Sequence, residues 1–201
     1  MQLAFKPRLT PEDYLAGELT SDTRYEYVDG EVYAMAAVSE SHNLIAGNVS
    51  AKLRNLVRGG PCRVFISDMK LRVAEWDAFY YPDVMVVCDA RDTQTHYKEH
   101  PSLVVEVLSP STESTDRREK MLAYRSLPSL REYLLIAQDK PHMELYRRAE
   151  NGAWYLAVLP DGAAVPLECV NASLTLDEVY EDVMFIPNMP EDLMDIAPVA
   201  R

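Results

Sequence analysis

The sequence predicts a single α+β (mixed α/β) domain in which a central mixed sheet is flanked by helices. A chain of 201 residues with 48% hydrophobic and 26% charged residues has the size and balance of one globular domain with a substantial core. Short apolar runs bounded by turn residues predict strands. Helical segments interrupt these runs without the regular strand–helix alternation of a Rossmann fold or a barrel.

The N-terminal part predicts a short helix, a hairpin and a long helix. Thr10 supplies a helix cap and Pro11 the first helical position, with acidic residues in the first turn. Asp29-Gly30 lies between two β-forming runs, which is a strong hairpin signal. Apolar residues then recur at helical spacing over residues 39–58, until Gly59-Gly60 ends the helix.

The rest of the chain supplies the sheet. Further strands are expected at residues 63–67, 70–73, 83–88, 102–108 and 131–137. A helix is expected from Ser111 or Thr112 to about residue 127, where Pro128 ends it, and a last short helix at residues 174–183. Asn151-Gly152 predicts a C-terminal hairpin. We expect residues 1–186 to form the domain and residues 187–201 a tail or partner-contacting arm.

Composition restricts the location and the partners of the protein. No run approaches the roughly 20 apolar residues of a membrane helix, and the start lacks a secretion signal, so we expect a cytoplasmic protein without a membrane partner. Cys62, Cys88 and Cys169 are an odd, widely spaced set that indicates buried thiols in a reducing cytosol. The net charge of −12 disfavours tight, non-specific DNA binding by the monomer.

Two carboxylates stand out in the middle of the chain. Glu106 lies inside an apolar run, where an ionised carboxylate is costly unless it is paired or binds a metal. If the run after Asp83 pairs antiparallel with the run after Pro101, with Cys88 opposite Pro101, then Asp83 lies opposite Glu106 with Cβ atoms about 5 Å apart. A divalent cation between them, Mg²⁺ or Mn²⁺, would relieve their repulsion. The alternative is that Asp83 caps a turn and Glu106 pairs with an arginine such as Arg72.

A lysine follows on the next predicted helix. Asp116, Lys120 and Tyr124 are four residues apart and share one helix face. Because this helix begins just after the strand that carries Glu106, it can fold back and present Lys120 to the carboxylates. There the lysine could orient the attacking water or stabilise charge on a phosphate. The alternative is an ordinary surface ion pair between Asp116 and Lys120.

Short motifs in a particular order carry a family resemblance. They are Tyr25-Glu-Tyr-Val-Asp-Gly-Glu31, Ser41-His42-Asn43, Pro82-Asp83, Val105-Glu106-Val107, Lys120 with Tyr124, and Glu132-Tyr-Leu-Leu-Ile136. Over about residues 10–180 the chain thereby resembles the restriction endonuclease family of the PD-(D/E)XK nuclease superfamily, which was long catalogued only as a domain of unknown function. The resemblance implies a restriction-endonuclease-like core, extended by an N-terminal helix and hairpin and by a C-terminal hairpin.

The resemblance also assigns roles to individual residues. It implies that Asp83 and Glu106 are metal ligands, that the backbone carbonyl of Val107 is a third ligand, and that Mg²⁺ or Mn²⁺ is the cofactor. The superfamily lysine lies two residues after the second acid, where this chain has Leu108. Family members look as though the lysine has moved to the following helix, which makes Lys120 its substitute.

Other candidates have two interpretations each. His42 either assists at the site, since family members tend to carry a histidine there, or is a polar residue at a helix start. Glu31 either supplies another carboxylate or, like Glu26, is an exposed hairpin residue. Asp68 is a strand-break residue before it is a ligand, and Tyr124 is expected to pack against the lysine or to orient it.

Two functions from different classes follow. The first is a Mg²⁺-dependent endonuclease that hydrolyses DNA phosphodiester bonds with Asp83, Glu106 and Lys120. The alternative is a catalytically degenerate module that binds DNA or dimerises, which Leu108 and the acidic charge favour. A hydrolase of a smaller phosphate ester would also fit the acidic surface. The Met-rich and Pro-rich segment at residues 184–198 predicts a homodimer.

Overall fold

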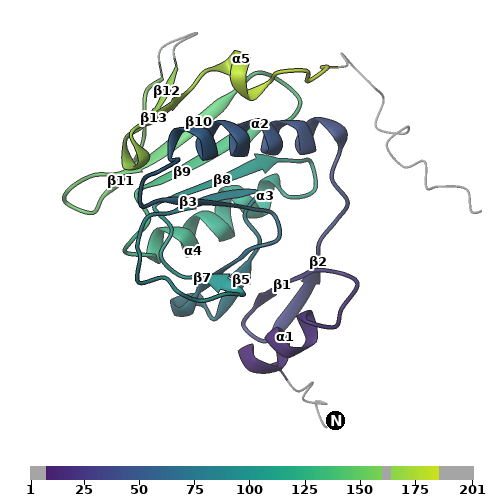
Figure 1. Cartoon of the computed structure of the whole chain (residues 1–201). Helices are drawn as coiled ribbons and strands as arrows, with labels where there is room; N and C mark the ends of the chain where they lie inside the picture. Colours follow the sequence, from purple (N-terminus) through teal and green to yellow (C-terminus); the bar gives the residue numbers. More distant parts are fainter. Residues whose placement is uncertain (1–7, 160–163, 186–201) are drawn as a thin grey trace, which may run out of the picture.

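A six-stranded mixed sheet forms the centre of the molecule (Figure 1). The computed structural model describes residues 8–159 and 164–185. The strand order is β11-β10-β9-β8-β6-β3, with β8 and β9 parallel and the other neighbours antiparallel. The strands are β3 (Arg63–Ile66), β6 (Val84–Val87), β8 (Leu103–Leu108), β9 (Glu132–Ala137), β10 (Met143–Arg148) and β11 (Trp154–Leu156). The predicted fold class is confirmed.

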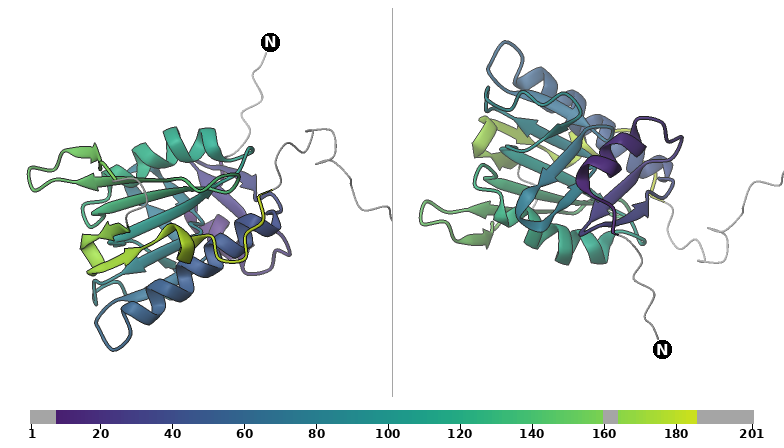
Figure 2. Two further views of the ribbon diagram at one scale, coloured as in Figure 1. Left: turned by 90° about the horizontal axis from the view of Figure 1, so that it is seen from above. Right: turned by 90° about the horizontal axis from the view of Figure 1, so that it is seen from below.

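Helices cover both faces of this sheet, as Figure 2 shows from above. The long helix α2 (Glu40–Leu56) packs Ile45 and Val49 against one face, together with Val105 of β8. On the other face lies one continuous helical segment built from α3 (Glu113–Thr115), a π-helical turn η2 (Asp116–Lys120) and α4 (Met121–Ser126). It packs Met121 and Tyr124 against Val104 and Leu108 of β8. Because side chains alternate along a strand, β8 serves two cores, and Glu106 lies on the α4 side.

A second sheet of order β2-β1-β5-β4-β7 lies beside the first. Its strands are β1 (Tyr25–Val28), β2 (Glu31–Ala34), β4 (Lys70–Val73), β5 (Ala78–Tyr80) and β7 (Tyr97–Lys98). The predicted N-terminal helix α1 (Pro11–Glu18) is capped by Thr10, and it packs Tyr14 against Tyr27 and Phe79. The predicted hairpin turns at Asp29-Gly30, both with positive φ. Because β1 pairs with β5, the N-terminal hairpin is part of the second sheet, and α1 packs on that sheet.

Several elements differ from the prediction. The last helix α5 (Leu176–Val179) is shorter than expected at both ends: a capping box between Thr175 and Glu178 starts it at Leu176, and it ends at Val179. Before it lies a small sheet of β12 (Val165–Leu167) and β13 (Ala172–Leu174), joined by the 3₁₀ turn η3 (Glu168–Val170). A similar 3₁₀ turn, η1 (Ala74–Trp76), joins β4 to β5. None of the helices in the described part of the chain has the length and apolar character needed to cross a bilayer.

The expected tail at residues 187–201 lies outside the described residues. The same holds for nearly all of the segment at 184–198 from which the homodimer was inferred, so the dimer stays a prediction.

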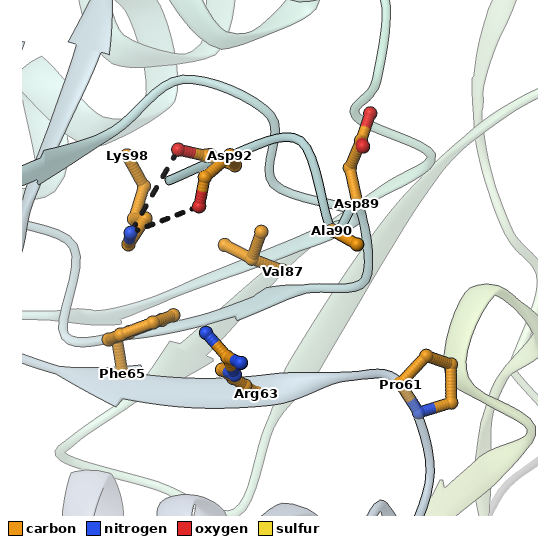
Figure 3. A pocket seen from close by; sticks show the side chains of 8 residues that line it. All are labelled: Pro61, Arg63, Phe65, Val87, Asp89, Ala90, Asp92 and Lys98. Carbon is orange, nitrogen blue, oxygen red and sulfur yellow. Dashed lines mark hydrogen bonds and ion pairs between the residues drawn. The ribbon is translucent and has the colours of Figure 1, made fainter. Parts of the chain in front are cut away.

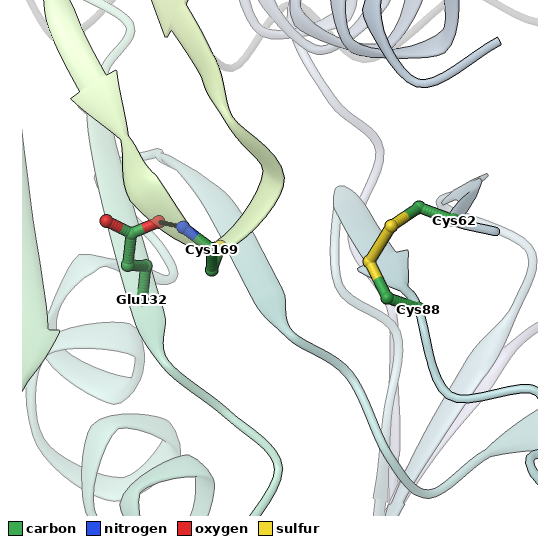
Figure 4. The surroundings of a disulfide bond; sticks show 4 residues. All are labelled: Cys62, Cys88, Glu132 and Cys169. Atoms are coloured by element: carbon green, nitrogen blue, oxygen red, sulfur yellow. Dashed lines mark hydrogen bonds between the residues drawn. A yellow bond between two sulfur atoms is a disulfide. The ribbon is translucent and has the colours of Figure 1, made fainter. Parts of the chain in front are cut away.

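The expectation of three buried thiols is wrong. Cys62 and Cys88 form a disulfide, 26 residues apart in sequence, while Cys169 stays free (Figure 4). The cause is the register of β3 on β6, in which Arg63 pairs with Val87, so that the next residues outward are the two cysteines. The bond removes the reason to place the protein in a reducing compartment.

Loss of this disulfide should lower stability. Replacing both cysteines (Cys62→Ser with Cys88→Ser) frees a loop of 26 residues in the unfolded chain. We expect the free energy of unfolding to fall by about 3 kcal/mol, measured by chemical denaturation. Wild type with a reducing agent should match the double variant, and Cys169→Ser should keep the bond. Equal stability of oxidised wild type and the double variant would contradict the prediction.

Candidate active site

Four acidic side chains and one lysine meet between the two large sheets and the helical segment. They come from separate elements: Glu26 from β1, Asp83 from the residue before β6, Glu106 from β8, and Asp116 and Lys120 from η2. Three of them, Glu106, Asp116 and Lys120, are buried in the described structure. The site therefore forms only when the chain has folded around it.

Asp83 and Glu106 face each other as the apolar pattern predicts. Val84 pairs with Val105 in the antiparallel β6–β8 ladder, which places Asp83 opposite Glu106. The backbone N–H of Asp83 donates to Glu106 Oε2 at 3.3 Å, and the backbone N–H of Val107 donates to Asp83 Oδ2 at 2.7 Å. Each carboxylate thus accepts a hydrogen bond from the backbone of the segment that carries the other acid.

Lys120 folds back onto these acids. Its Nζ lies 2.9 Å from Glu26 Oε1, 3.3 Å from Asp116 Oδ1 and 3.4 Å from Glu106 Oε1. Lys120 is only 6% exposed and Glu106 only 2%, so the alternative of a surface ion pair is wrong. The hydroxyl of Tyr124 donates to Glu106 Oε1 at 2.9 Å, so Tyr124 orients the same carboxylate oxygen that Lys120 approaches.

His42 fits both of its interpretations. Its backbone N–H donates to Ser39 Oγ, which caps the start of α2, and its Nε2 lies 3.2 Å from Asp83 Oδ2. The Ser39 cap fixes the first turn of the helix, so the imidazole is held beside Asp83, the residue before β6. The Val107 N–H and the His42 imidazole both contact Oδ2 of Asp83. Among the described residues, no hydrogen bond or ion pair reaches its other oxygen, Oδ1.

Other candidates lie away from the cluster. The side chain of Glu31 accepts a hydrogen bond from Tyr33 on the exposed strand β2, so it does not supply a carboxylate. Asp68 is exposed and pairs with Arg24. Arg72 lies 3.6 Å from Glu99, so the alternative in which it pairs with Glu106 is wrong.

Two members of the cluster were not expected as site residues. Glu26 was expected to be exposed, but it reaches Lys120, and its Oε1 also accepts the backbone N–H of Tyr81 at 3.2 Å. Asp116 was noted only as a helix neighbour of Lys120. The spacing of four between Asp116 and Lys120 was the one signal in the sequence that could have placed Asp116 in the site.

Burial and charge change the acid–base properties of the cluster. Burial raises the pKa of Glu106 well above its ordinary value, which Lys120 opposes and the neighbouring acids reinforce. Burial also raises the pKa of Asp116, again against the effect of Lys120. For Lys120, burial alone would lower the pKa, but the carboxylates of Glu106, Glu26 and Asp116 outweigh it and raise the pKa. The ammonium therefore keeps its charge, while Glu106 and Asp116 hold protons more readily than free carboxylates do.

The donor set suits a hard divalent cation. All four acids offer oxygen atoms, and a single ammonium lies near three of them. Buried Asp116 Oδ1 lacks a hydrogen-bond partner among the described residues, although Lys120 Nζ lies 3.3 Å from it. Within the described residues, however, no three acidic, histidine or cysteine side chains converge as ready metal ligands.

Surface hollows lie outside the cluster. One of about 70 Å³ lies along β3 and β6, where Asp92 and Lys98 face each other (Figure 3). A larger hollow of about 220 Å³ lies at the carboxyl ends of β8 and β9. None of the five cluster residues lines it in the described structure, but its lining includes Leu108, two residues after Glu106 on β8, and Arg117, the residue after Asp116.

Comparison with known proteins places this geometry in context. The family model "Uma2: Putative restriction endonuclease" matches residues 11–177. An uncharacterized protein of Synechocystis sp., slr1290, is 36% identical over 180 residues, covering 89% of this chain and 95% of the relative. A second one, sll1609, is 35% identical over 162 residues, covering 79% and 92%.

A crystal structure gives the same fold. It is described as a putative nuclease belonging to DUF820 from Anabaena variabilis, and it matches with a TM-score of 0.70 over 86% of this chain and 97% of that chain. At 18% sequence identity this likeness concerns the fold alone.

The raised pKa of Glu106 predicts a dependence of stability on pH. In metal-free protein the folded state retains a proton that the unfolded chain releases above the ordinary pKa of 4.5. The contribution of Glu106 to stability is therefore largest below that pH and is lost as the pH rises towards the folded pKa. Glu106→Gln removes the titration, so in EDTA the variant should gain stability relative to wild type as the pH rises above 4.5.

Chemical denaturation at a series of pH values measures this difference. Glu150→Gln changes an exposed carboxylate in the turn between β10 and β11, and it should leave the pH profile of wild type unchanged. Parallel profiles for Glu106→Gln and wild type would show that Glu106 titrates normally.

Proposed function

Because the chain belongs to the Uma2 family of restriction-endonuclease-like proteins, we propose that it is a Mg²⁺-dependent endonuclease that hydrolyses phosphodiester bonds in DNA. The observation that carries this proposal is the facing pair of Asp83 and Glu106 with the ammonium of Lys120 within 3.4 Å of Glu106. Two acids can supply oxygen ligands to a divalent ion, and a nearby lysine can stabilise charge on a phosphate, so this cluster offers groups that metal-assisted phosphodiester hydrolysis can use.

Asp83 and Glu106 would hold the metal, with the backbone carbonyl of Val107. A bound divalent ion supplies Lewis-acid activation of water and neutralises charge on a phosphate. Asp83 presents Oδ1, because His42 and the N–H of Val107 occupy Oδ2. The N–H of Val107 points towards Asp83, and in an extended strand the carbonyl of a residue lies at the same edge as its N–H.

Lys120 and Tyr124 act on the other side of Glu106. The hydroxyl of Tyr124 keeps Glu106 in place by donating to Oε1. The ammonium of Lys120, once released from Glu106, can stabilise the negative charge that develops on the phosphate during attack. This is the role that the superfamily gives to a lysine at the position of Leu108.

The DNA backbone would approach over the larger hollow. Arg117, Lys140 and His142 line it, at the carboxyl ends of the parallel strands β8 and β9, where ligands of α/β sheets commonly bind. Arg117 is held in place by Glu144 through two hydrogen bonds of 2.8 Å. Arg117 and Lys140 share this lining with three acids, so they would give modest DNA affinity, which fits the net charge of −12.

A second candidate is the non-catalytic module. It is favoured by the closure of the cluster, since Glu106 is 2% exposed and Lys120 pairs with three acids. In such a module the lysine would serve as the permanent counterion of the acids, and the protein would bind DNA without cutting it.

Plasmid cleavage separates the two candidates. Purified protein should nick or linearise plasmid in Mg²⁺ or Mn²⁺, and EDTA should stop the reaction. Asp83→Ala and Glu106→Ala should each abolish cleavage, because either change removes an anionic ligand. Lys120→Ala should slow turnover by roughly 10²–10³-fold, the usual cost of losing one charge-stabilising donor.

Glu150→Ala, made in the same way, is the matched control and should cleave like wild type. Cleavage that persists in the Asp83→Ala variant would show a contaminating nuclease. Wild type that binds DNA but never cuts it with either metal would favour the non-catalytic module.

A further inference from the structure

We infer that Glu26 is a positioning residue that holds the ammonium of Lys120 while Glu106 is given over to a divalent cation. The inference rests on the proposed function and assigns a task to an acid from the N-terminal hairpin, outside the strands that carry the proposed ligands. It concerns a charge exchange inside the cluster, in which Lys120 changes its partner when a metal arrives.

Glu26 is the nearest anion of Lys120, although the ammonium also donates a hydrogen bond to Glu106. Glu26 Oε1 lies 2.9 Å from Lys120 Nζ, nearer than the oxygens of Asp116 at 3.3 Å and Glu106 at 3.4 Å. The Glu106 oxygen that faces the lysine already accepts from Tyr124. Glu106 can therefore leave the lysine and keep a hydrogen-bond donor, while Lys120 keeps its closest anion.

A second contact joins Glu26 to the segment that carries Asp83. Oε1 of Glu26 accepts the backbone N–H of Tyr81, two residues before Asp83, at 3.2 Å. The carboxylate of Glu26 therefore contacts both the ammonium of Lys120 and the backbone of the segment that leads into Asp83, the first proposed metal ligand. Glu26 itself is fixed because the next residue, Tyr27, is fully buried and pairs with Phe79 of β5.

Charge explains why such a partner is needed. Lys120 is 6% exposed, and a buried ammonium without an anion costs several kcal/mol. A divalent ion that takes Glu106 removes one of the three anions of the lysine. If Glu26 were neutral, the lysine would depend more on Glu106, and a metal would have to compete with it. Neutralising Glu26 should therefore weaken metal binding even though Glu26 is not itself a ligand.

The test is Mn²⁺ binding to the purified full chain, followed by electron paramagnetic resonance of the free ion. Glu26→Gln should weaken Mn²⁺ binding roughly 10-fold, the size of coupling expected between charged groups in contact. Lys120→Met in the Glu26→Gln background should restore the affinity, because the competing ammonium is gone. Glu31→Gln changes an exposed carboxylate on the same hairpin, and it should bind Mn²⁺ like wild type.

Each other outcome has one meaning. Unchanged affinity in Glu26→Gln would overturn the inference, and so would a double variant as weak as Glu26→Gln, since Glu26 would then be a ligand. If Glu26→Gln fails to fold by circular dichroism, Glu26→Ala, which also removes the charge, replaces it, and unchanged affinity there also overturns the inference. Wild type that binds no Mn²⁺ would overturn the proposed function itself, and the inference with it.

Discussion

The buried ion cluster of Lys120 with Glu26, Glu106 and Asp116 is the interaction on which the arrangement of the elements depends. Charges of this kind are tolerated in a protein interior only when each finds its partner in the folded state. Strand β8 delivers Glu106, the helical segment over it delivers Lys120, and the N-terminal hairpin delivers Glu26. The position of the hairpin is thereby tied to the position of the helix, although the two are far apart in sequence.

The π-helical turn of η2 belongs to the same constraint. A wider turn changes which side chains point inward, and such turns are frequent at functional sites. In η2 both Asp116 and Lys120 are buried, while Arg117 turns outward to Glu144 and Glu119 accepts from the hydroxyl of Tyr80. A four-residue spacing predicted the shared face of Asp116 and Lys120, but nothing in the sequence indicated the π turn. Its geometry depends on the ion cluster beneath it.

The sequence predicted those parts of the site that rest on local pattern. The facing of Asp83 and Glu106 followed from two short apolar strands whose ends define one register, and the structure has that register. The position of Glu26 could not be predicted, because an exposed and a buried glutamate look alike in a hairpin of four-residue strands. The disulfide was missed for a related reason. Cys62 and Cys88 meet only through the pairing of β3 with β6, which no turn between them specifies.

Leu108 shows how the lysine could move from strand to helix. A lysine two residues after Glu106 would share its face of β8, where Leu108 instead packs with Met121 and Tyr124 in the core beneath α4. An apolar side chain there strengthens the contact between β8 and the helix, and that contact sets the height of Lys120 above Glu106. Under the proposed function, in which Lys120 takes the part of the strand lysine, the two features are linked. Leu108 then helps to hold the helical segment that supplies Lys120, and the ammonium reaches Glu106 from that segment and not from β8.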